Sequence, residues 1–265
     1  MSIPKIIHQI YLQGEVNIPD NIKASVHELR QRNPNWEYRL YDETQILKYI
    51  QQHYGQETLD TYLLINENYA AARSDFFRYL LMYQEGGVYL DLKSSCAVPF
   101  DEILHHDDEF IICGWENEAG QQYQGYGINK HLKSLKNGEY QQWNIIAKPH
   151  SPFLKAVIDE VNFRIHHYTP MRYHVGRKGV LNTTGPVPYS LAIEKIIQTQ
   201  AYKYRYERFA SELGLIYINA DTSVVNKNHY RLQINPVVKL NTLNNIVYKL
   251  WLYLLHPRKA FNQHK

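Results

Sequence analysis

The sequence predicts an α/β fold in which a largely parallel central sheet is flanked by helices. Short apolar segments alternate with helical patterns through the first half of the chain, which is typical of strand–helix–strand units. Hydrophobic residues make up 44% of the 265 residues, enough to bury a full core. The length suits one large domain or two small ones, and we find no internal repeat and no low-complexity linker.

The chain opens with a strand, a helix and a second strand. Residues 3–12, IPKIIHQIYL, have the pattern of a buried strand. Residues 20–32 predict a helix, with Asp20 as its N-cap because a carboxylate there accepts the free amide hydrogens of the first turn. Asn33-Pro34-Asn35 ends this helix. WEYRLYD (36–42) then alternates bulky and polar residues, which predicts the second strand.

Helical patterns continue up to a glycine pair. Residues 44–53 and 56–65 predict two helices, and the pattern from 69 to 85 is helical throughout. Gly86 follows where a helix commonly ends in a left-handed residue. The next segment, VYLDL (88–92), is rich in apolar and aromatic residues and predicts a short strand.

The second half contains fewer clear elements. EFIICGW (109–115) predicts a strand, and residues 153–167 and 187–200 predict helices. IYI (216–218) predicts a late strand. We expect one domain over residues 1–240, followed by a distinct tail at 241–265.

Composition excludes several classes of protein. The net charge of +3 is too small to indicate a nucleic-acid partner. Cys96 and Cys113 are too few for a secreted disulfide framework and form no zinc-type pair, so we expect a reducing compartment. The N-terminus lacks the long apolar run and cleavage site of a signal peptide, and no window reaches the roughly 20 apolar residues of a membrane span. We therefore expect a cytoplasmic location.

Two acids and an arginine surround one helix–turn–strand, SDFFRYLLMYQEGGVYLDLKSS (74–95). Asp75 and Arg78 are three positions apart, so they share one helix face. A surface ion pair would also explain this spacing, but the surrounding helix is mostly apolar, which favours a pocket. Asp91 falls near the carboxyl end of a predicted strand, where ligands bind in α/β sheets. The pattern predicts a site for a metal, a ribose or a sugar.

This run resembles the signature of the family 32 glycosyltransferases, the DXD sugar-binding group, which includes bacterial capsule and lipooligosaccharide enzymes. IPKIIHQIYL and PNWEYRLYD are similar to the first two strands of that family. NTTGPVPYSLAI (182–193) is similar to its T-G-P segment, and NKNHY (226–230) stands where a C-terminal histidine loop is expected. Together the resemblance covers most of residues 3–230.

The resemblance implies a GT-A fold, in which a Rossmann-like nucleotide-sugar half merges with an acceptor half. It also implies that residues 1–240 form a catalytic domain. The expected partners are a nucleotide-sugar donor and a glycan or glycolipid acceptor, usually with a divalent cation, and the reaction would retain the anomeric configuration. A UDP-sugar is the favoured donor and GDP-mannose the other candidate. The expected acceptor is a surface glycan such as capsule or lipooligosaccharide.

Carried over by position, the resemblance also implies roles for individual residues. Tyr11 replaces the tryptophan of the family and would stack on the nucleobase. Asp75 and Arg78 would hold the hydroxyls of the donor sugar, and Asp91 would contact ribose or sugar and the metal. With Lys93, these three form the predicted catalytic set. The further positions predicted to bind the nucleotide sugar are His8, Gln9, Ser74, Gly87, Tyr89, Thr184, Gly185 and Pro186.

Lys93 departs from the family pattern, because the triplet here is Asp91-Leu92-Lys93 and the usual motif is Asp-X-Asp. In one interpretation, Asp91, His229 and diphosphate oxygens still hold Mn²⁺ or Mg²⁺. In the other, the Lys93 ammonium takes the place of the ion against the diphosphate and no metal is needed. We favour a retained but weakened dependence on metal.

Two other classes of function stay open. Lys93 is compatible with a nucleotide-sugar-binding protein that has lost catalysis, and donor hydrolysis would exclude this class. A metal-dependent phosphotransferase or nuclease could use Asp75 and Asp91, but it would require more clustered carboxylates and would leave Tyr11 and the T-G-P segment unexplained.

Two further segments have open interpretations. YHVGRKG (173–179) is basic and rich in glycine, which fits either a flexible loop over phosphates or a solvated loop. The tail, from Ile246, reads IVYKLWLYLLHPRKAFNQHK and is too short to span a bilayer. Its aromatic and basic residues fit an interfacial segment on the inner face of the cytoplasmic membrane. A helix docked on the domain, or a dimer contact, would give the same pattern.

Overall fold

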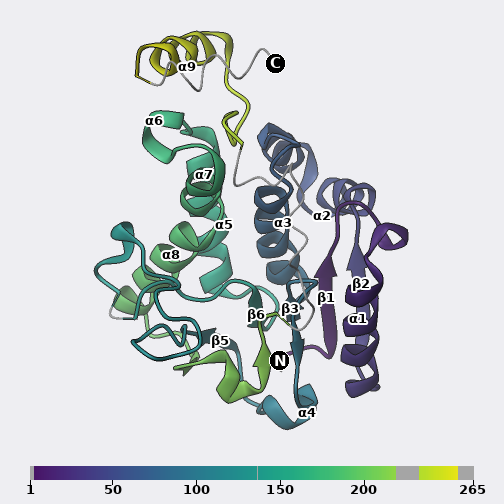
Figure 1. Ribbon diagram of the computed structural model, residues 1–265. Coiled ribbons are helices and arrows are strands. Elements are labelled where there is room, and N and C mark those ends of the chain that lie inside the picture. The colour runs from purple at the N-terminus through teal and green to yellow at the C-terminus, as the bar shows by residue number, and fades with distance from the viewer. Residues whose placement is uncertain (1–2, 136, 219–232, 256–265) are drawn as a thin grey trace.

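Six strands form the central sheet of the computed structural model, which describes residues 3–135, 137–218 and 233–255 (Figure 1). Their order is β2-β1-β3-β6-β5-β7. The strands are β1 (Ile6–Ile10), β2 (Glu37–Tyr41), β3 (Gly87–Leu90), β5 (Phe110–Cys113), β6 (Asn144–Ala147) and β7 (Arg205–Glu207). Five of them run in one direction, whereas β6 is antiparallel to both of its neighbours. The largely parallel α/β sheet predicted from the sequence is therefore present, with one reversed strand.

Alternation along the strands divides the core between the two faces of the sheet. Tyr89 of β3 packs into one apolar cluster, whereas its neighbours Val88 and Leu90 pack into the other. The first cluster lies under α2 (Glu43–Leu64), α3 (Ala70–Glu85), α5 (Pro152–His166) and α8 (Pro186–Thr199). The second is covered by α1 (Asp20–Arg32) and α4 (Phe100–Ile103). Because successive strand residues point to opposite faces, each short strand contributes to both layers.

The N-terminal helices begin and end close to their predicted positions, with one correction. Asp20 is not an N-cap: Pro19 holds that position, and Asp20 is the first helical residue, with no side-chain capping bond. The two helices predicted over 44–65 form the single element α2, interrupted at Gly55, whose φ of 77° lies in the left-handed region. Asp42 and Gln45 form a capping box at the start of α2.

A glycine pair turns the chain from α3 back into the sheet. Gly86 and Gly87 have φ angles of 66° and 95°, which L side chains rarely adopt. A Cβ on Gly87 would lie 2.5 Å from the carbonyl oxygen of Ile6, because β3 begins directly beside β1. The turn predicted after residue 85 is confirmed, and it fixes how the last residues of α3 enter the sheet.

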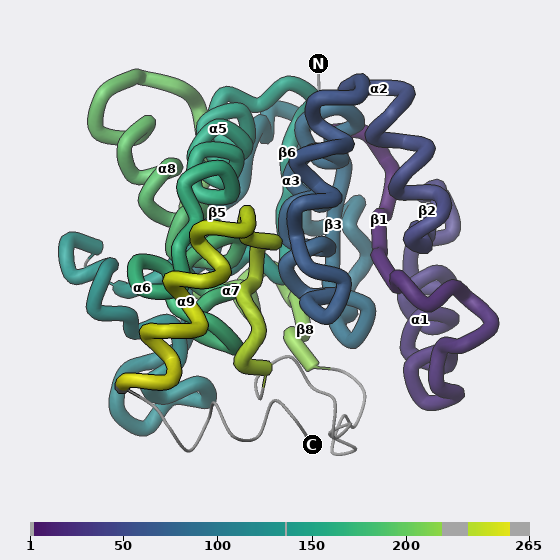
Figure 2. The backbone as a smooth tube through the Cα atoms, turned by 90° about the horizontal axis from the view of Figure 1, so that it is seen from above, coloured from purple at the N-terminus to yellow at the C-terminus, as the bar shows by residue number. Residues whose placement is uncertain are grey.

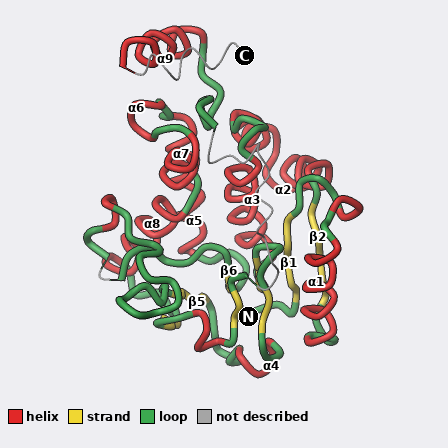
Figure 3. The backbone as a smooth tube through the Cα atoms, in the orientation of Figure 1, coloured by secondary structure: helices red, strands yellow, loops and turns green. Residues whose placement is uncertain are grey.

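The second half departs further from the sequence-based expectations. Between β5 and β6, the described part of the long connection contains only the short helix η2 (Lys130–Leu132) as regular structure (Figure 3). Residues 173–179, predicted as a loop, contain the end of α6 (Pro170–Tyr173) and the start of α7 (Gly176–Thr183). The late strand, predicted over 216–218, is the two-residue β8 (Leu215–Ile216), which pairs with β4 (Ser95–Cys96). The remaining short helices are η1 (Glu15–Asn17) and η3 (Ala210–Leu213).

The last described helix, α9 (Thr242–Leu255), lies beside α6 and α7 in both views of the chain (Figures 1 and 2). Tyr248 fixes it by donating a hydrogen bond of 2.7 Å to the Ile234 carbonyl. Among the described helices, none has both the length and the apolar composition needed to cross a bilayer.

Candidate active site

The two acids and the arginine singled out in the sequence meet in one cluster. The guanidinium of Arg78 lies 2.8 Å from a carboxylate oxygen of Asp75 and 3.1 Å from one of Asp91. The side chains of Arg78 and Asp75 are 6% and 4% exposed, whereas that of Asp91 is 26% exposed. The prediction that these three residues come together is confirmed, and Asp91 is the member of the cluster most open to solvent.

The backbone around Asp91 is held in place by three different parts of the chain. Its amide donates to the Trp143 carbonyl at 2.8 Å, which ties the end of β3 to the residue just before β6. Its carbonyl accepts from the Gln9 side chain at 3.2 Å and from the Ser94 amide at 2.8 Å. The tight turn from Asp91 to Ser94 therefore places the carboxylate at the carboxyl end of β3, where ligands commonly bind in α/β sheets.

Two neighbours of Arg78 complete its surroundings. The Tyr89 ring lies 4.8 Å from the guanidinium carbon, and the Tyr89 hydroxyl donates to Asp91 at 3.0 Å. The Gln142 carbonyl accepts from Arg78 at 2.9 Å, and the Gln142 side chain lies 3.4 Å from Asp75. Gln142 is a residue that the sequence analysis missed, because it precedes β6, a short apolar strand with no alternating pattern to reveal it.

The T-G-P segment reaches the same cluster from the other half of the chain. The Thr184 hydroxyl donates to Asp75 at 3.0 Å, and the Thr184 carbonyl accepts from Tyr79 at 2.9 Å. Gly185 is the N-cap of α8, where a Cβ would lie 2.9 Å from the backbone of Leu181, and Pro186 is the first helical residue. Thr184 thus contacts the site, while Gly185 and Pro186 shape the backbone that places it.

Burial changes the acid–base properties of the cluster. It raises the pKa of Asp75 from 3.8 to about 6, although Arg78 and the Thr184 hydroxyl favour the ionised carboxylate. Burial also disfavours the charge of Arg78, but Tyr89, Asp91 and Asp75 outweigh it and hold the pKa of Arg78 above its ordinary value. Arg78 is therefore charged at every pH of interest, while Asp75 titrates close to neutrality.

Lys93 lies at the edge of the cluster on the turn after β3. Its ammonium is 4.7 Å from the centre of the Tyr217 ring and 3.4 Å from the Tyr217 hydroxyl. Within the described residues, no carboxylate lies within ion-pair distance of Lys93. Among the residues that the structure describes, no acid therefore neutralises its positive charge, which can attract an anionic ligand.

The described residues supply only part of a metal site. They contain no group of three acidic, histidine or cysteine side chains that could hold an ion. Asp91 is present, but one of its oxygens already interacts with Arg78 and Tyr89. The second predicted ligand, His229, lies outside the described residues. In the described part of the chain, one carboxylate and the oxygens of a bound diphosphate would have to hold the ion.

His8 and Gln9 support the turn from inside the protein. His8 is fully buried; its Nε2 donates to the Gly86 carbonyl at 3.0 Å, and Nδ1 lies 3.3 Å from the Tyr41 hydroxyl. Burial lowers the pKa of His8 to about 4, so the ring is neutral. Gln9 is also buried, between Tyr38 and the Asp91 carbonyl. Both lie inside the protein, where they support the turn, and their predicted binding of the nucleotide sugar stays a prediction.

Tyr11 and Ser74 remain accessible. Tyr11 follows β1, is half-buried, and donates its hydroxyl to the Asn17 carbonyl at 3.2 Å. Ser74 is half-buried on α3, one residue before Asp75, and its carbonyl accepts from Arg78 at 3.4 Å. Their predicted contacts with a nucleotide sugar stay predictions.

Comparison with known proteins places this cluster in a family. Residues 19–110, which include Asp75, Arg78 and Asp91, match the family described as "Glycosyltransferase sugar-binding region containing DXD motif". The chain belongs to this glycosyltransferase family. The fold of the chain is also that of a known GT-A domain: it superimposes on the UDP-bound glycosyltransferase domain of the YGT toxin with a TM-score of 0.53, over 97% of this chain and 91% of that one, at 9% identity.

Two of the curated relatives of the chain come from yeasts. Inositol phosphoceramide mannosyltransferase 3 of Schizosaccharomyces pombe is 32% identical over 193 residues, covering 72% of this chain and 44% of the relative. Mannosyl phosphorylinositol ceramide synthase SUR1 of Saccharomyces cerevisiae is 33% identical over 102 residues, covering 38% and 25%. The chain thus matches less than half the length of these relatives.

Proposed function

We propose that this glycosyltransferase moves a hexosyl group from a nucleotide-sugar donor to a hydroxyl of a glycan or glycolipid acceptor. The observation that supports this most directly is the placement of Arg78 between Asp75 and Asp91 at the end of β3, two residues before Lys93, for which the described residues supply no acidic partner. Carboxylates accept hydrogen bonds from sugar hydroxyls, while the two cations match a diphosphate in charge.

Each residue of the cluster has a separate role in this proposal. Asp75, fixed by Thr184, accepts hydrogen bonds from donor hydroxyls. Arg78 and Lys93 stabilise the negative charge that develops on the leaving diphosphate as the bond from the anomeric carbon to oxygen breaks. A positive charge that is already in place costs no reorganisation at that moment, so positioning is the main catalytic effect.

The acceptor attacks on the face that the diphosphate leaves, and a phosphate oxygen takes its proton. This route gives the retention of configuration expected from the family. It needs no protein nucleophile on the opposite face of the sugar. Asp75 is already engaged by Arg78 and Thr184, which suits a binding role better than that of a nucleophile.

Mannose is our first candidate for the transferred sugar, because both curated relatives named above are mannose-transferring proteins by name. A UDP-hexose, the donor favoured from the sequence, is the second candidate, and the similar fold of a UDP-bound domain is compatible with it. A capsule or lipooligosaccharide acceptor and a cytoplasmic location stay predictions.

A divalent ion, when bound, would add positive charge to the diphosphate, and Asp91 is the described residue that would hold it. Because Lys93 already supplies one positive charge there, we expect a partial dependence on Mn²⁺ or Mg²⁺. The rest of the proposed chemistry depends on the side chains of the chain itself.

The test is a panel of nucleotide sugars, GDP-mannose and UDP-hexoses included, assayed for donor hydrolysis with Mn²⁺ and with chelator. We expect one donor to be hydrolysed, and Arg78→Lys to reduce the rate strongly while circular dichroism stays unchanged. Lys keeps the charge but cannot bridge two carboxylates as a guanidinium does. Binding of a donor without any hydrolysis or transfer would instead identify a nucleotide-sugar-binding protein.

A further inference from the structure

A large cavity opens at the N-terminal end of α7, separate from the Asp75 cluster. It has a volume of about 830 Å³ and lies between η2, the α6–α7 connection, α7 and residues 233–234. The side chains of Lys130, His131, His174, Arg177 and Lys178 line it. No Asp or Glu is among the described residues that line the cavity, so its charge is positive.

The cations of this basic cavity are not neutralised within the described part of the chain. Lys130, Arg177 and Lys178 make no ion pair there; Glu139 acts on Arg177 only from beyond ion-pair distance. Burial lowers the pKa of His174, and the nearby charges of Lys130, Lys178 and His131 lower it further. The first turn of α7 adds to the positive potential of the cavity, because its N-cap residue, Val175, has no side chain that could accept hydrogen bonds from the backbone amides of that turn.

A buried acceptor on α7 also borders the basic cavity. Asn182 is 7% exposed and lines the cavity, yet its side-chain oxygen has no hydrogen-bond partner among the described residues. Buried polar atoms are rarely left in this state, so this part of α7 is unusual among the buried polar groups of the described residues. The cations that line the cavity match a phosphate group in charge.

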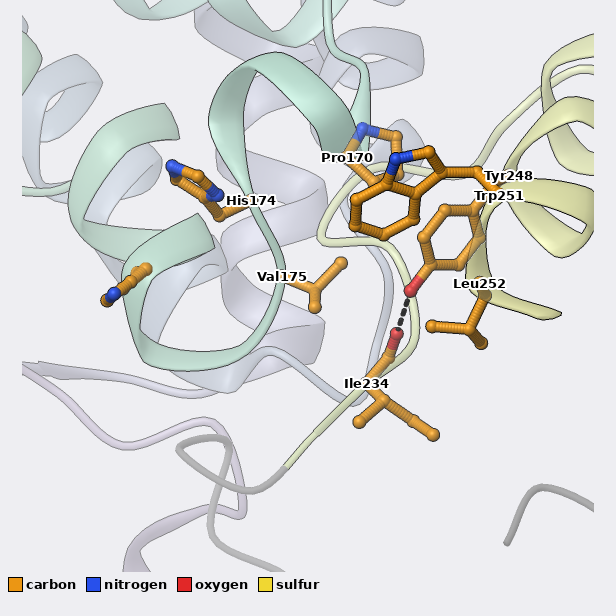
Figure 4. A pocket seen from close by; sticks show the side chains of 8 residues that line it. Pro170, His174, Val175, Ile234, Tyr248, Trp251 and Leu252 are labelled. Carbon is orange, nitrogen blue, oxygen red and sulfur yellow. Dashed lines mark hydrogen bonds between the residues drawn. The ribbon is translucent and has the colours of Figure 1, made fainter. Parts of the chain in front are cut away.

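An apolar pocket of about 280 Å³ continues from the basic cavity toward α9 (Figure 4). The two share His174, Val175, Lys178 and Ile234. Figure 4 shows Trp251 and Leu252 of α9 on the other side of this pocket from His174 and Val175. A ligand that spans both would need an anionic head and an apolar body.

The outward face of α9 is apolar as well. Tyr248 and Leu252 are buried toward the domain, whereas another row of side chains is exposed. This row consists of Leu243, Ile246, Val247, Leu250 and Leu254, with exposures of 70%, 52%, 43%, 59% and 74%. Residues 242–255 contain no Asp or Glu, and Lys249 is their one charged residue. A helix with this pattern is suited to the interface of an anionic bilayer.

We propose that the basic cavity binds the phosphate of a membrane lipid headgroup while the exposed row of α9 inserts into the same bilayer surface. This inference rests on the proposed function in one respect: the lipid bound in the cavity would be the acceptor of the sugar, so the acceptor would carry a phosphate. The cavity runs along α7 from its first turn to Asn182, and the eight residues of this helix span about 12 Å and end next to Thr184, which contacts Asp75. The headgroup would therefore be held one short helix away from the donor sugar.

Vesicle flotation tests this proposal without using enzyme activity. We expect the wild-type chain to float with vesicles of phosphatidylcholine and phosphatidylglycerol, and not with phosphatidylcholine alone. The variant Lys130→Gln/Arg177→Gln/Lys178→Gln should lose on the order of tenfold or more in partitioning, because each cation near an anionic surface contributes measurably. Leu250→Glu should weaken binding as well.

A matched control removes the same charge elsewhere on the surface. Lys48, Lys155 and Lys195 are exposed and do not line the cavity, so their triple Gln variant should keep most of the binding. Equal loss in the control, or undiminished binding of the cavity variant, would overturn the proposal. Thermal melts establish that all variants fold.

Two further results would point to other occupants and so reject the lipid. One is calorimetric binding of glycerol phosphate that depends on the cavity cations, without any vesicle binding. The other is a dimer in light scattering that Leu250→Glu dissociates, since a second copy would then cover α9. Donor hydrolysis by the wild type is measured separately, so its failure would reject the proposed function and leave the vesicle result to be judged by itself.

Discussion

Thr184 donates its hydroxyl to the carboxylate of Asp75 at 3.0 Å, which joins two residues 109 positions apart in the sequence. The contact connects the start of α8 to the middle of α3, the helix that also carries Arg78. It leaves Asp75 with a guanidinium on one oxygen and a hydroxyl on the other. The surroundings of Asp75, of Lys93 and of the buried His8 lead to five predictions.

Replacing Asp75 by Asn should lower kcat/KM for the donor by about two orders of magnitude, because a neutral amide cannot accept sugar hydroxyls as a carboxylate does. Arg78 keeps Asp91 as a partner at 3.1 Å, so the charge is not left unpaired and the fold should persist. Donor kinetics and thermal melts of the two proteins measure this. Unchanged kinetics in a folded variant would show that Asp75 does not contribute to binding or turnover of the donor.

The same carboxylate should set an acidic limit on activity. With the pKa of Asp75 raised to about 6 by burial, kcat/KM should fall below pH 6 as Asp75 takes up a proton. The contribution of Asp75 to stability changes with pH in the opposite direction, because the folded state binds this proton more tightly than the unfolded state. That contribution is full below the ordinary pKa of 3.8 and is lost as pH rises through 6. Asp75→Asn should remove both effects.

Thr184→Val should move the acidic limit of kcat/KM to higher pH. The Thr184 hydroxyl favours the ionised form of Asp75, so its removal raises the pKa of that carboxyl further. The Ser variant keeps the hydroxyl and serves as the matched control, with a profile close to that of the wild type. If Val and Ser variants shared one pH profile, the hydrogen bond would have no influence on Asp75.

Substitution of Lys93 should change the dependence on metal. Lys93→Gln removes the ammonium, so we expect activity in chelator to fall by about tenfold to a hundredfold, with partial recovery in Mn²⁺. Lys93→Asp restores the family motif and should make activity depend fully on the ion. Donor hydrolysis with Mn²⁺ and with chelator measures both. Full wild-type activity in chelator would exclude a role for metal altogether.

His8→Ala should destabilise the protein and leave the donor KM of the folded fraction unchanged. The substitution removes the donor to the buried Gly86 carbonyl and leaves a cavity, at a cost of about 2–4 kcal/mol. His8 also makes stability depend on pH: its contribution is full above the ordinary pKa of 6.5 and is lost as pH falls through about 4. Denaturant unfolding at several pH values tests this, and a large change in KM would return His8 to the ligand-binding residues.

The sequence by itself determined the α/β class, the N-terminal strands and helices, and the cluster of Asp75, Arg78 and Asp91. These features are local: apolar periodicity defines each element, the i, i+3 spacing puts two side chains on one helix face, and the glycine pair forces an immediate return into the sheet. Each of these features lies within a short stretch of chain, so it could be recognised without knowing its contacts with distant residues.

Only the tertiary structure decided the direction of β6, the contacts of Gln142 and Thr184 with the cluster, and the internal position of His8. Each depends on packing between segments far apart in the chain. A fully buried short strand has no alternation to reveal its direction, and a histidine on a strand looks the same whether it faces a ligand or the core. The basic cavity is also a feature that only the tertiary structure could show, because it forms only when η2, α7 and residues 233–234 come together.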